Sequence, residues 1–156
     1  MPRPIPALVS FALLCACAQD LESSGPPAPT PPATDSSPRA LFAEYPDLLL
    51  EAVAASCEGP GRRVVRPEPG EVRCEGLPPV EAAASLILQY DGIVEDLPRY
   101  VSSIAVGESD AGYLVTADTY IRVPQRSGEL RIVRLPDPEL EALIRDVFLR
   151  AGGAPV

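Results

Sequence analysis

The sequence contains no histidine, lysine, asparagine or tryptophan. Without histidine, the chain lacks the usual general base at neutral pH and the commonest metal ligand, and a Ser-His-Asp triad is excluded. Without lysine, it has no residue for Schiff-base chemistry and no lysine for a phosphate-binding loop. Gly-x-Ser-x-Gly and glycine-rich phosphate-binding motifs are also missing. We therefore predict a protein that is not an enzyme and that uses no cofactor.

Positive charge is scarce as well. The 156 residues carry 13 basic residues, all arginine, against 22 acidic ones, a net charge of −9. A general nucleic-acid binder needs a basic surface, so we predict no nucleic-acid partner. The acids include two small groups, Asp91, Glu95 and Asp96 after a predicted helix, and Glu108 with Asp110 in a predicted turn. Neither group fits the calcium-loop pattern, and we interpret both as solvated surface acids with no metal site.

The N-terminal residues have the layout of a secretory signal. A short start with the single cation Arg3 precedes an apolar run from Ile5 to Leu14 and then small residues. The run is too short for a membrane-spanning helix, which needs roughly 20 apolar residues. We predict that residues 1–16 are a signal peptide and that the chain is exported.

Leu14-Cys15-Ala16-Cys17 resembles the lipobox of bacterial membrane lipoproteins, in which a leucine and a small residue precede an invariant cysteine. The resemblance implies cleavage before Cys17, diacylation of its thiol and acylation of the new amine. Cys15 departs from the Ala, Ser, Thr or Val usual in the family. The resemblance also implies a lipid-anchored envelope protein facing the periplasm, and Ala18 favours the outer membrane because it replaces the aspartate of inner-membrane retention.

A second cleavage site remains open. Ala16-Cys17-Ala18 also fits the Ala-x-Ala site of ordinary signal peptidase, which would release a soluble periplasmic chain beginning at Gln19. No family is recognised for the rest of the chain.

Cys57 and Cys74 are the two thiols left after either cleavage. An even count in an exported chain predicts a disulfide. Two sulfurs without histidine are too few for a zinc site, and the spacing is not that of a Cys-x-x-Cys redox pair. We predict a structural disulfide, worth about 3 kcal/mol for a loop of this length.

Residues 17–38 contain the lipid-attachment position and then a stretch rich in proline and serine with one large apolar side chain, Leu21. We predict a disordered linker of extended, polyproline-like chain that serves as a tether. Residues 39–156 are predicted to form one small α+β domain. The expected order is α-β-β-α-β-β-β-α, with an antiparallel sheet packed on helices.

Periodicity and turn residues place these elements. The last helix has the clearest signals, with Asp137 as its cap and Pro138 as its first residue. The predicted helices cover residues 40–56 with a restart at Pro46, 79–91 and 138–151. The predicted strands cover residues 62–66, 71–75, 99–108, 112–124 and 129–135.

The predicted turns set a register for the last three strands. If Glu108 faces Tyr113 and Pro124 faces Glu129, one face is apolar, and we expect helices to cover it. The opposite face then aligns arginines across the three strands, beside an apolar and aromatic row. These two rows are Arg99, Arg122 and Arg131, and Val101, Tyr120 and Val133. Such a face fits docking of an anionic or carboxylate-bearing partner, whereas a solvated or helix-covered face explains the same pattern.

We expect a non-catalytic envelope lipoprotein that is attached to the membrane through Cys17 and binds a protein partner or supports envelope assembly. The candidate partner surface is Arg99, Tyr120, Arg122 and Arg131. The alternative is a soluble exported domain that binds a small ligand or hydrolyses a substrate with acids alone. That alternative predicts a pocket around Asp91 and Glu95.

Overall fold

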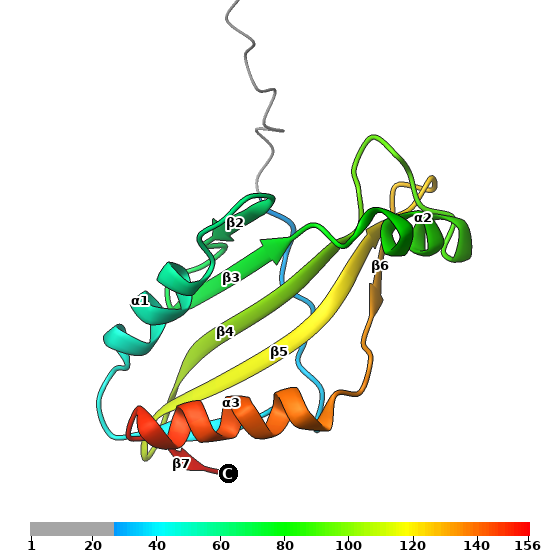
Figure 1. The fold of residues 1–156 in the computed structure, drawn as a ribbon. Helices are drawn as coiled ribbons and strands as arrows, with labels where there is room; N and C mark the ends of the chain where they lie inside the picture. The colour runs from blue at the N-terminus through cyan, green and yellow to red at the C-terminus, as the bar shows by residue number, and fades with distance from the viewer. Residues whose placement is uncertain (1–26) are drawn as a thin grey trace, which may run out of the picture.

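An antiparallel sheet of seven strands forms the body of the protein, which a computed structural model describes for residues 27–156 (Figure 1). The sheet order is β2-β3-β4-β5-β1-β7, and β6 pairs with β5. The strands are β1 (Arg39–Phe42), β2 (Arg62–Val65), β3 (Glu71–Gly76), β4 (Arg99–Ser109), β5 (Gly112–Pro124), β6 (Leu130–Val133) and β7 (Ala154–Pro155). The helices are α1 (Asp47–Ser56), α2 (Val80–Gln89) and α3 (Pro138–Arg150). The predicted α+β class is confirmed.

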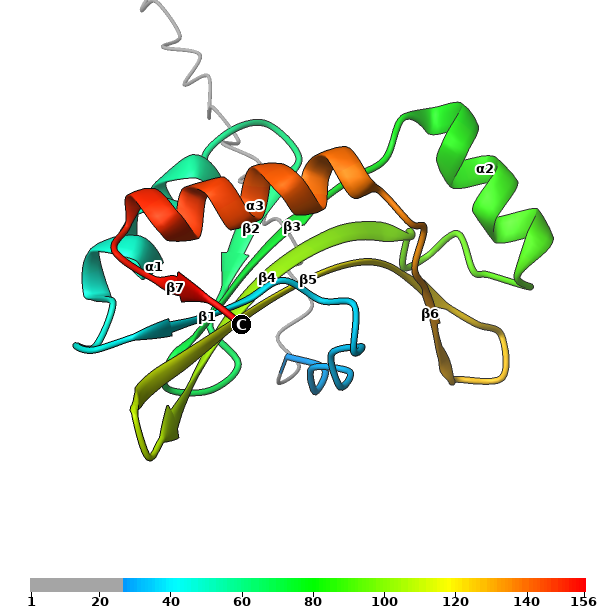
Figure 2. The same ribbon diagram turned by 90° about the horizontal axis from the view of Figure 1, so that it is seen from below.

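Helices α1 and α3 cover one face of the sheet over different strands (Figure 2). Helix α1 packs on β3, and α3 packs on β1 and β7. Its cap is the predicted one, since the Asp137 carboxylate accepts a hydrogen bond from the Leu140 amide at 2.9 Å. The core lies between the sheet and these two helices and consists of Ala40, Phe42, Leu49, Ile104, Val115, Ala117 and Phe148.

The segment before α1 is a strand, so the predicted helix over residues 40–56 is wrong in its first part. Strand β1 pairs with β5 on one side and with β7 on the other. Ala40 and Phe42 are buried and alternate with the half-buried Arg39 and Leu41, as expected for a strand in a sheet. A Cβ on Gly153 would lie 2.6 Å from the Phe42 ring, so glycine lets the C-terminus pack against β1.

The register between β4 and β5 is the predicted one, with Glu108 opposite Tyr113 and Arg99 opposite Arg122. The register between β5 and β6 is shifted by one residue, because Pro124 pairs with Leu130 rather than Glu129. The turn over residues 125–129 therefore holds one more residue than expected, with Gly128 at a φ of +85°. Such a shift turns every side chain of β6 to the other face.

Helix α2 stands apart from the other helices, beyond the ends of β4 and β5 (Figures 1 and 2). Ala83 is its one buried residue, whereas Val80 and Leu88 are 80% and 85% exposed. The periodic apolar stripe therefore marks the helix correctly but does not pack fully on the body. Over residues 27–156, no helix has the length and apolarity to cross a bilayer.

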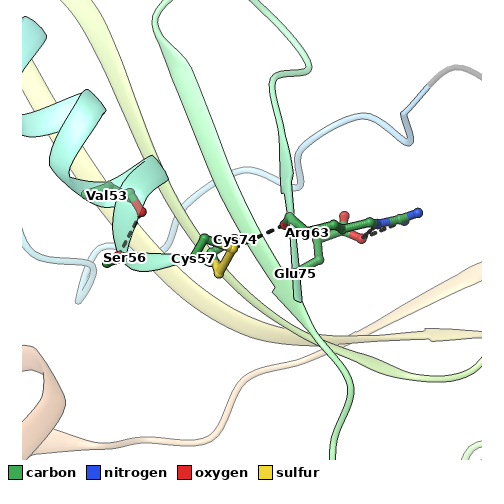
Figure 3. Close-up of a disulfide and its surroundings, with 6 residues drawn as sticks. All are labelled: Val53, Ser56, Cys57, Arg63, Cys74 and Glu75. Atoms are coloured by element: carbon green, nitrogen blue, oxygen red, sulfur yellow. Dashed lines mark hydrogen bonds and ion pairs between the residues drawn. A yellow bond between two sulfur atoms is a disulfide. The ribbon is translucent and has the colours of Figure 1, made fainter. Parts of the chain in front are cut away.

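A disulfide joins Cys57, directly after α1, to Cys74 on β3, as the sequence predicts (Figure 3). Their Cα atoms are 5.4 Å apart. The Cys57 sulfur also lies 3.3 Å from the carbonyl oxygen of Arg63 on β2. The bridge therefore fastens α1 to the hairpin that carries Arg63 and Glu75.

Candidate functional site

The face of the sheet away from α1 and α3 is charged and mostly buried. Strand alternation produces it, because Val72 and Cys74 of β3 point toward the helices and their neighbours point away. We call this surface the polar face, formed by Glu71, Arg73, Glu75, Arg99, Ser103, Asp118, Tyr120 and Arg122. Charged side chains are rarely buried unless they are paired, so we expect each charged group on this face to have a partner of opposite charge.

Three arginines converge on one carboxylate at the end of the polar face that lies beside β2. Oxygen Oε2 of Glu75 accepts hydrogen bonds from Arg63 Nη2 at 2.7 Å and Nε at 3.0 Å (Figure 3). The Nε atoms of Arg99 and Arg122 lie 3.9 and 3.7 Å from the same oxygen, beyond hydrogen-bond distance. We call Arg63, Arg99 and Arg122 the arginine cluster.

The arginine cluster holds more positive charge and more donors than its acids satisfy. Besides Glu75, the nearest carboxylate is that of Asp96, 3.6 Å from Arg122 Nη2. The Nε atoms of Arg99 and Arg122 are buried and find no hydrogen-bond acceptor within the described part of the chain. Burial and then the neighbouring charges of Arg63 and Arg122 lower the pKa of Arg99. An added carboxylate would accept from these donors and offset the repulsion among the guanidinium groups.

In the other half of the polar face, the charged side chains have hydrogen-bond partners. Arg73, 2% exposed, donates from Nε to Glu71 at 3.0 Å. Arg134 follows β6 and donates to the Asp118 carboxylate at 2.7 Å, a hydrogen bond that raises the pKa of Arg134. Its guanidinium also lies 5.6 Å from the centre of the Tyr120 ring. Burial raises the pKa of Tyr120 to about 12, and its buried hydroxyl has no partner among residues 27–156.

Residues 27–37, which we call the proline clasp, lie across this half of the polar face (Figure 2). Arg73 Nη2 donates to the Ala28 carbonyl at 2.7 Å, and Arg134 Nη2 donates to the Pro32 carbonyl at 2.8 Å. Between them, the Thr30 hydroxyl donates to Glu71. The prediction of a solvated linker therefore does not hold for these residues, because two arginines distant in the sequence, the buried Arg73 and the partly exposed Arg134, bind their carbonyl groups.

Three of the four residues predicted for the partner surface lie on the polar face, and the fourth lies on the opposite face of the sheet. Arg99, Tyr120 and Arg122 lie where expected, but the predicted position of Arg131 is wrong. The shifted register sets Arg131 opposite Val123 on the helix side and places Ile132 opposite Arg122. Arg134, after the end of β6, lies over the Tyr120 ring instead. Sequence reasoning also missed Arg63 and Glu75, although both lie in the predicted strands 62–66 and 71–75, which the structure pairs so that they face one another.

The acids singled out by the sequence do not form a common site. Asp91 pairs with Arg126 at 3.5 Å, whereas Asp96 lies at the arginine cluster. No group of three or more potential metal ligands occurs in the described range. The expected pocket around Asp91 and Glu95 is not among three cavities of about 330–350 Å³, which other residues line.

One of these cavities, of about 340 Å³, is a groove between α1 and α3. It exists because the two helices cover different outer strands and leave the middle of β4 and β5 open. Its lining is mainly apolar, with Ile104 and Ala117 from the sheet and Val53, Leu143 and Val147 from the helices. Leu143 is 58% exposed at its rim.

Two surfaces with binding chemistry thus lie on opposite faces of one sheet. The arginine cluster offers guanidinium donors to an anion, and the groove offers apolar walls. No protein-family model, curated protein or solved structure matches the chain.

Proposed function

We propose that the protein is an exported lipoprotein, anchored through Cys17, that binds a carboxylate-bearing protein partner of the bacterial envelope at its arginine cluster. The observation that carries this proposal is the pair of buried Nε donors of Arg99 and Arg122, which lack acceptors in residues 27–156. Leaving a buried donor unpaired costs about 1–3 kcal/mol. A partner carboxylate that accepts from both groups would recover this free energy on binding.

The side chains of the cluster are partly exposed, whereas the two Nε donors are buried, so binding of a carboxylate requires Arg99 and Arg122 to turn outward. The Arg63 side chain is 42% exposed and that of Arg99 is 21% exposed, whereas Arg122 behind them is 11% exposed. A partner carboxylate would approach past Arg63 and contact Arg99 first. Charge-assisted hydrogen bonds of this kind are stronger than neutral ones and specify geometry.

Export rests on the signal-like start and is supported by the disulfide, because disulfides persist in oxidising compartments. Cys17 lies outside the described residues, so its acylation is tested by the intact mass of the protein from host membranes. We expect a chain beginning at Cys17 that carries acyl chains. An unmodified chain beginning at Gln19 would contradict the anchor while leaving the binding site to be tested separately.

The partner site is tested by cross-linking in membranes of the native host, with Arg122→Gln as the test variant. Arg131→Gln is the matched control, because it removes the same charge from the opposite side of the sheet. We expect the wild type and Arg131→Gln to form the same cross-linked species, and Arg122→Gln to lose it at least about tenfold, the factor that 1.4 kcal/mol represents. Equal cross-linking by both variants would refute the site.

The apolar groove supports a second candidate function, binding of a small apolar ligand. Its volume of about 340 Å³ lies within the usual range of ligand pockets. An apolar dye such as Nile red tests it, with Leu143→Glu as the groove variant and the exposed Leu88→Glu as control. Binding lost in the first variant and kept in the second would favour this function.

A further inference from the structure

The proline clasp contacts the sheet in a regular manner. Its first eight residues, 27–34, include four prolines. Hydrogen bonds to the sheet involve alternate residues of the clasp, at Ala28, Thr30 and Pro32. The two carbonyl groups accept from arginines on opposite sides of the sheet centre, Arg73 on β3 and Arg134 after β6. The clasp therefore crosses the strands rather than adding a strand to the sheet edge.

The chemistry of this surface suits a chain rich in proline. Proline has no N–H group, so such a chain presents carbonyl acceptors and few donors. The polar face supplies the complementary donors, and each donor is held in place by its own carboxylate, Arg73 by Glu71 and Arg134 by Asp118. Proline-rich segments also lose little conformational entropy when they bind, because they are extended beforehand.

We propose that Arg73, Arg134 and Glu71 form a binding site for an extended proline-rich chain, and that residues 27–34 fill this site within the same molecule. This site is separate from the arginine cluster and does not depend on the partner proposed there. Its consequence for the tether does rest on acylation of Cys17. The ten Cα–Cα steps from Cys17 to Pro27 then span at most about 35 Å, and release of the clasp would roughly double this reach.

Backbone dynamics of the mature chain, with Cys17→Ser to prevent acylation, test the docked clasp. We expect ¹⁵N order parameters at Ala28, Thr30, Ala33 and Thr34 to approach the value of about 0.85 found in rigid strands. Arg134→Gln should lower them below about 0.6. Arg126→Gln, a control outside the site, should leave them unchanged. Values below about 0.6 in the wild type would overturn the proposal.

A second experiment separates loss of the site from loss of folding. Residues 28–32 are replaced by glycine and serine in the full mature chain, which leaves the sheet residues intact. A peptide of residues 27–36 is then added, and the Nε–H signals of Arg73 and Arg134 are followed. We expect a saturable shift, and at least tenfold weaker binding of a peptide whose prolines are replaced by serine. No shift at millimolar peptide, or equal binding of both peptides, would refute a site for a proline-rich chain.

Discussion

Glu75 is the acid on which the arginine cluster depends, and Glu75→Gln changes its charge with little change in shape. The Glu75 side chain is 4% exposed and lies within 4 Å of all three arginines of the cluster. Without its charge, Arg99 and Arg122 remain largely buried, close to one another and to Arg63. Removing one partner of a buried ion pair costs about 3–5 kcal/mol.

The lower end of that range applies here. Arg63 is partly exposed, and pairs near the surface contribute about 0–1 kcal/mol. The main loss comes from Arg99 and Arg122, with Asp96 as a remaining counter-charge for the latter. We therefore expect Glu75→Gln to lower the free energy of unfolding by about 3 kcal/mol.

Urea unfolding measures this loss. With an m-value of about 1–3 kcal/mol per molar urea, the midpoint should fall by at least about 1 M. Glu51→Gln, which removes the same charge from the exposed side of α1, should change stability by less than about 0.5 kcal/mol. Adding Arg122→Gln to Glu75→Gln should restore about 1 kcal/mol or more, because it removes an unpaired buried charge. A loss below about 1 kcal/mol, or additive losses in the double variant, would refute this reasoning.

Two further predictions concern stability. Reduction of the Cys57–Cys74 disulfide should lower the free energy of unfolding by about 3 kcal/mol and the Tm by about 10 °C, as calorimetry with and without reductant measures. An unchanged Tm would contradict a stabilising bridge. Burial raises the pKa of Tyr120 to about 12, above its unfolded value of 10, so the stability it contributes is complete below pH 10 and is lost as pH rises through 12. Between pH 10 and 12, the free energy of unfolding of Tyr120→Phe should therefore fall by about 2–3 kcal/mol less than that of the wild type. Parallel pH profiles of the two proteins would contradict the raised pKa of Tyr120.

Local signals account for much of the fold. The Asp137-Pro138 start of α3, the glycine and proline turns and the 3–4 periodicity of α2 each depend on neighbouring residues, and the elements they predict occur in the structure. Strand β1 was mistaken for helix because its partners, β5 and β7, lie more than 70 residues away. Distant pairing of this kind overrides local propensity.

The candidate site was partly predictable for a similar reason. The positions of Arg99 and Arg122 follow from the tight turn between β4 and β5. The predicted position of Arg131 is wrong because a single extra residue in the next turn places the side chains of β6 on the opposite faces. The proline clasp carried no local signal of docking. Its contacts with Arg73 and Arg134 span 45 and 102 residues of sequence. The composition of a segment shows that it cannot form a core of its own, but it does not show whether the segment docks on a distant part of the chain.

Binding of carboxylates by the arginine cluster can be observed by NMR of the mature protein with ¹⁵N-labelled arginine. Acetylated tetraglutamate is titrated while the Nε–H signals of the 12 arginines that remain after removal of residues 1–16 are followed. We predict saturable shifts at Arg99 and Arg122, with a dissociation constant below about 1 mM, or about −4 kcal/mol, and no saturable shift at Arg131. Uniform shifts across all arginines, or none at Arg99 and Arg122, would contradict such binding.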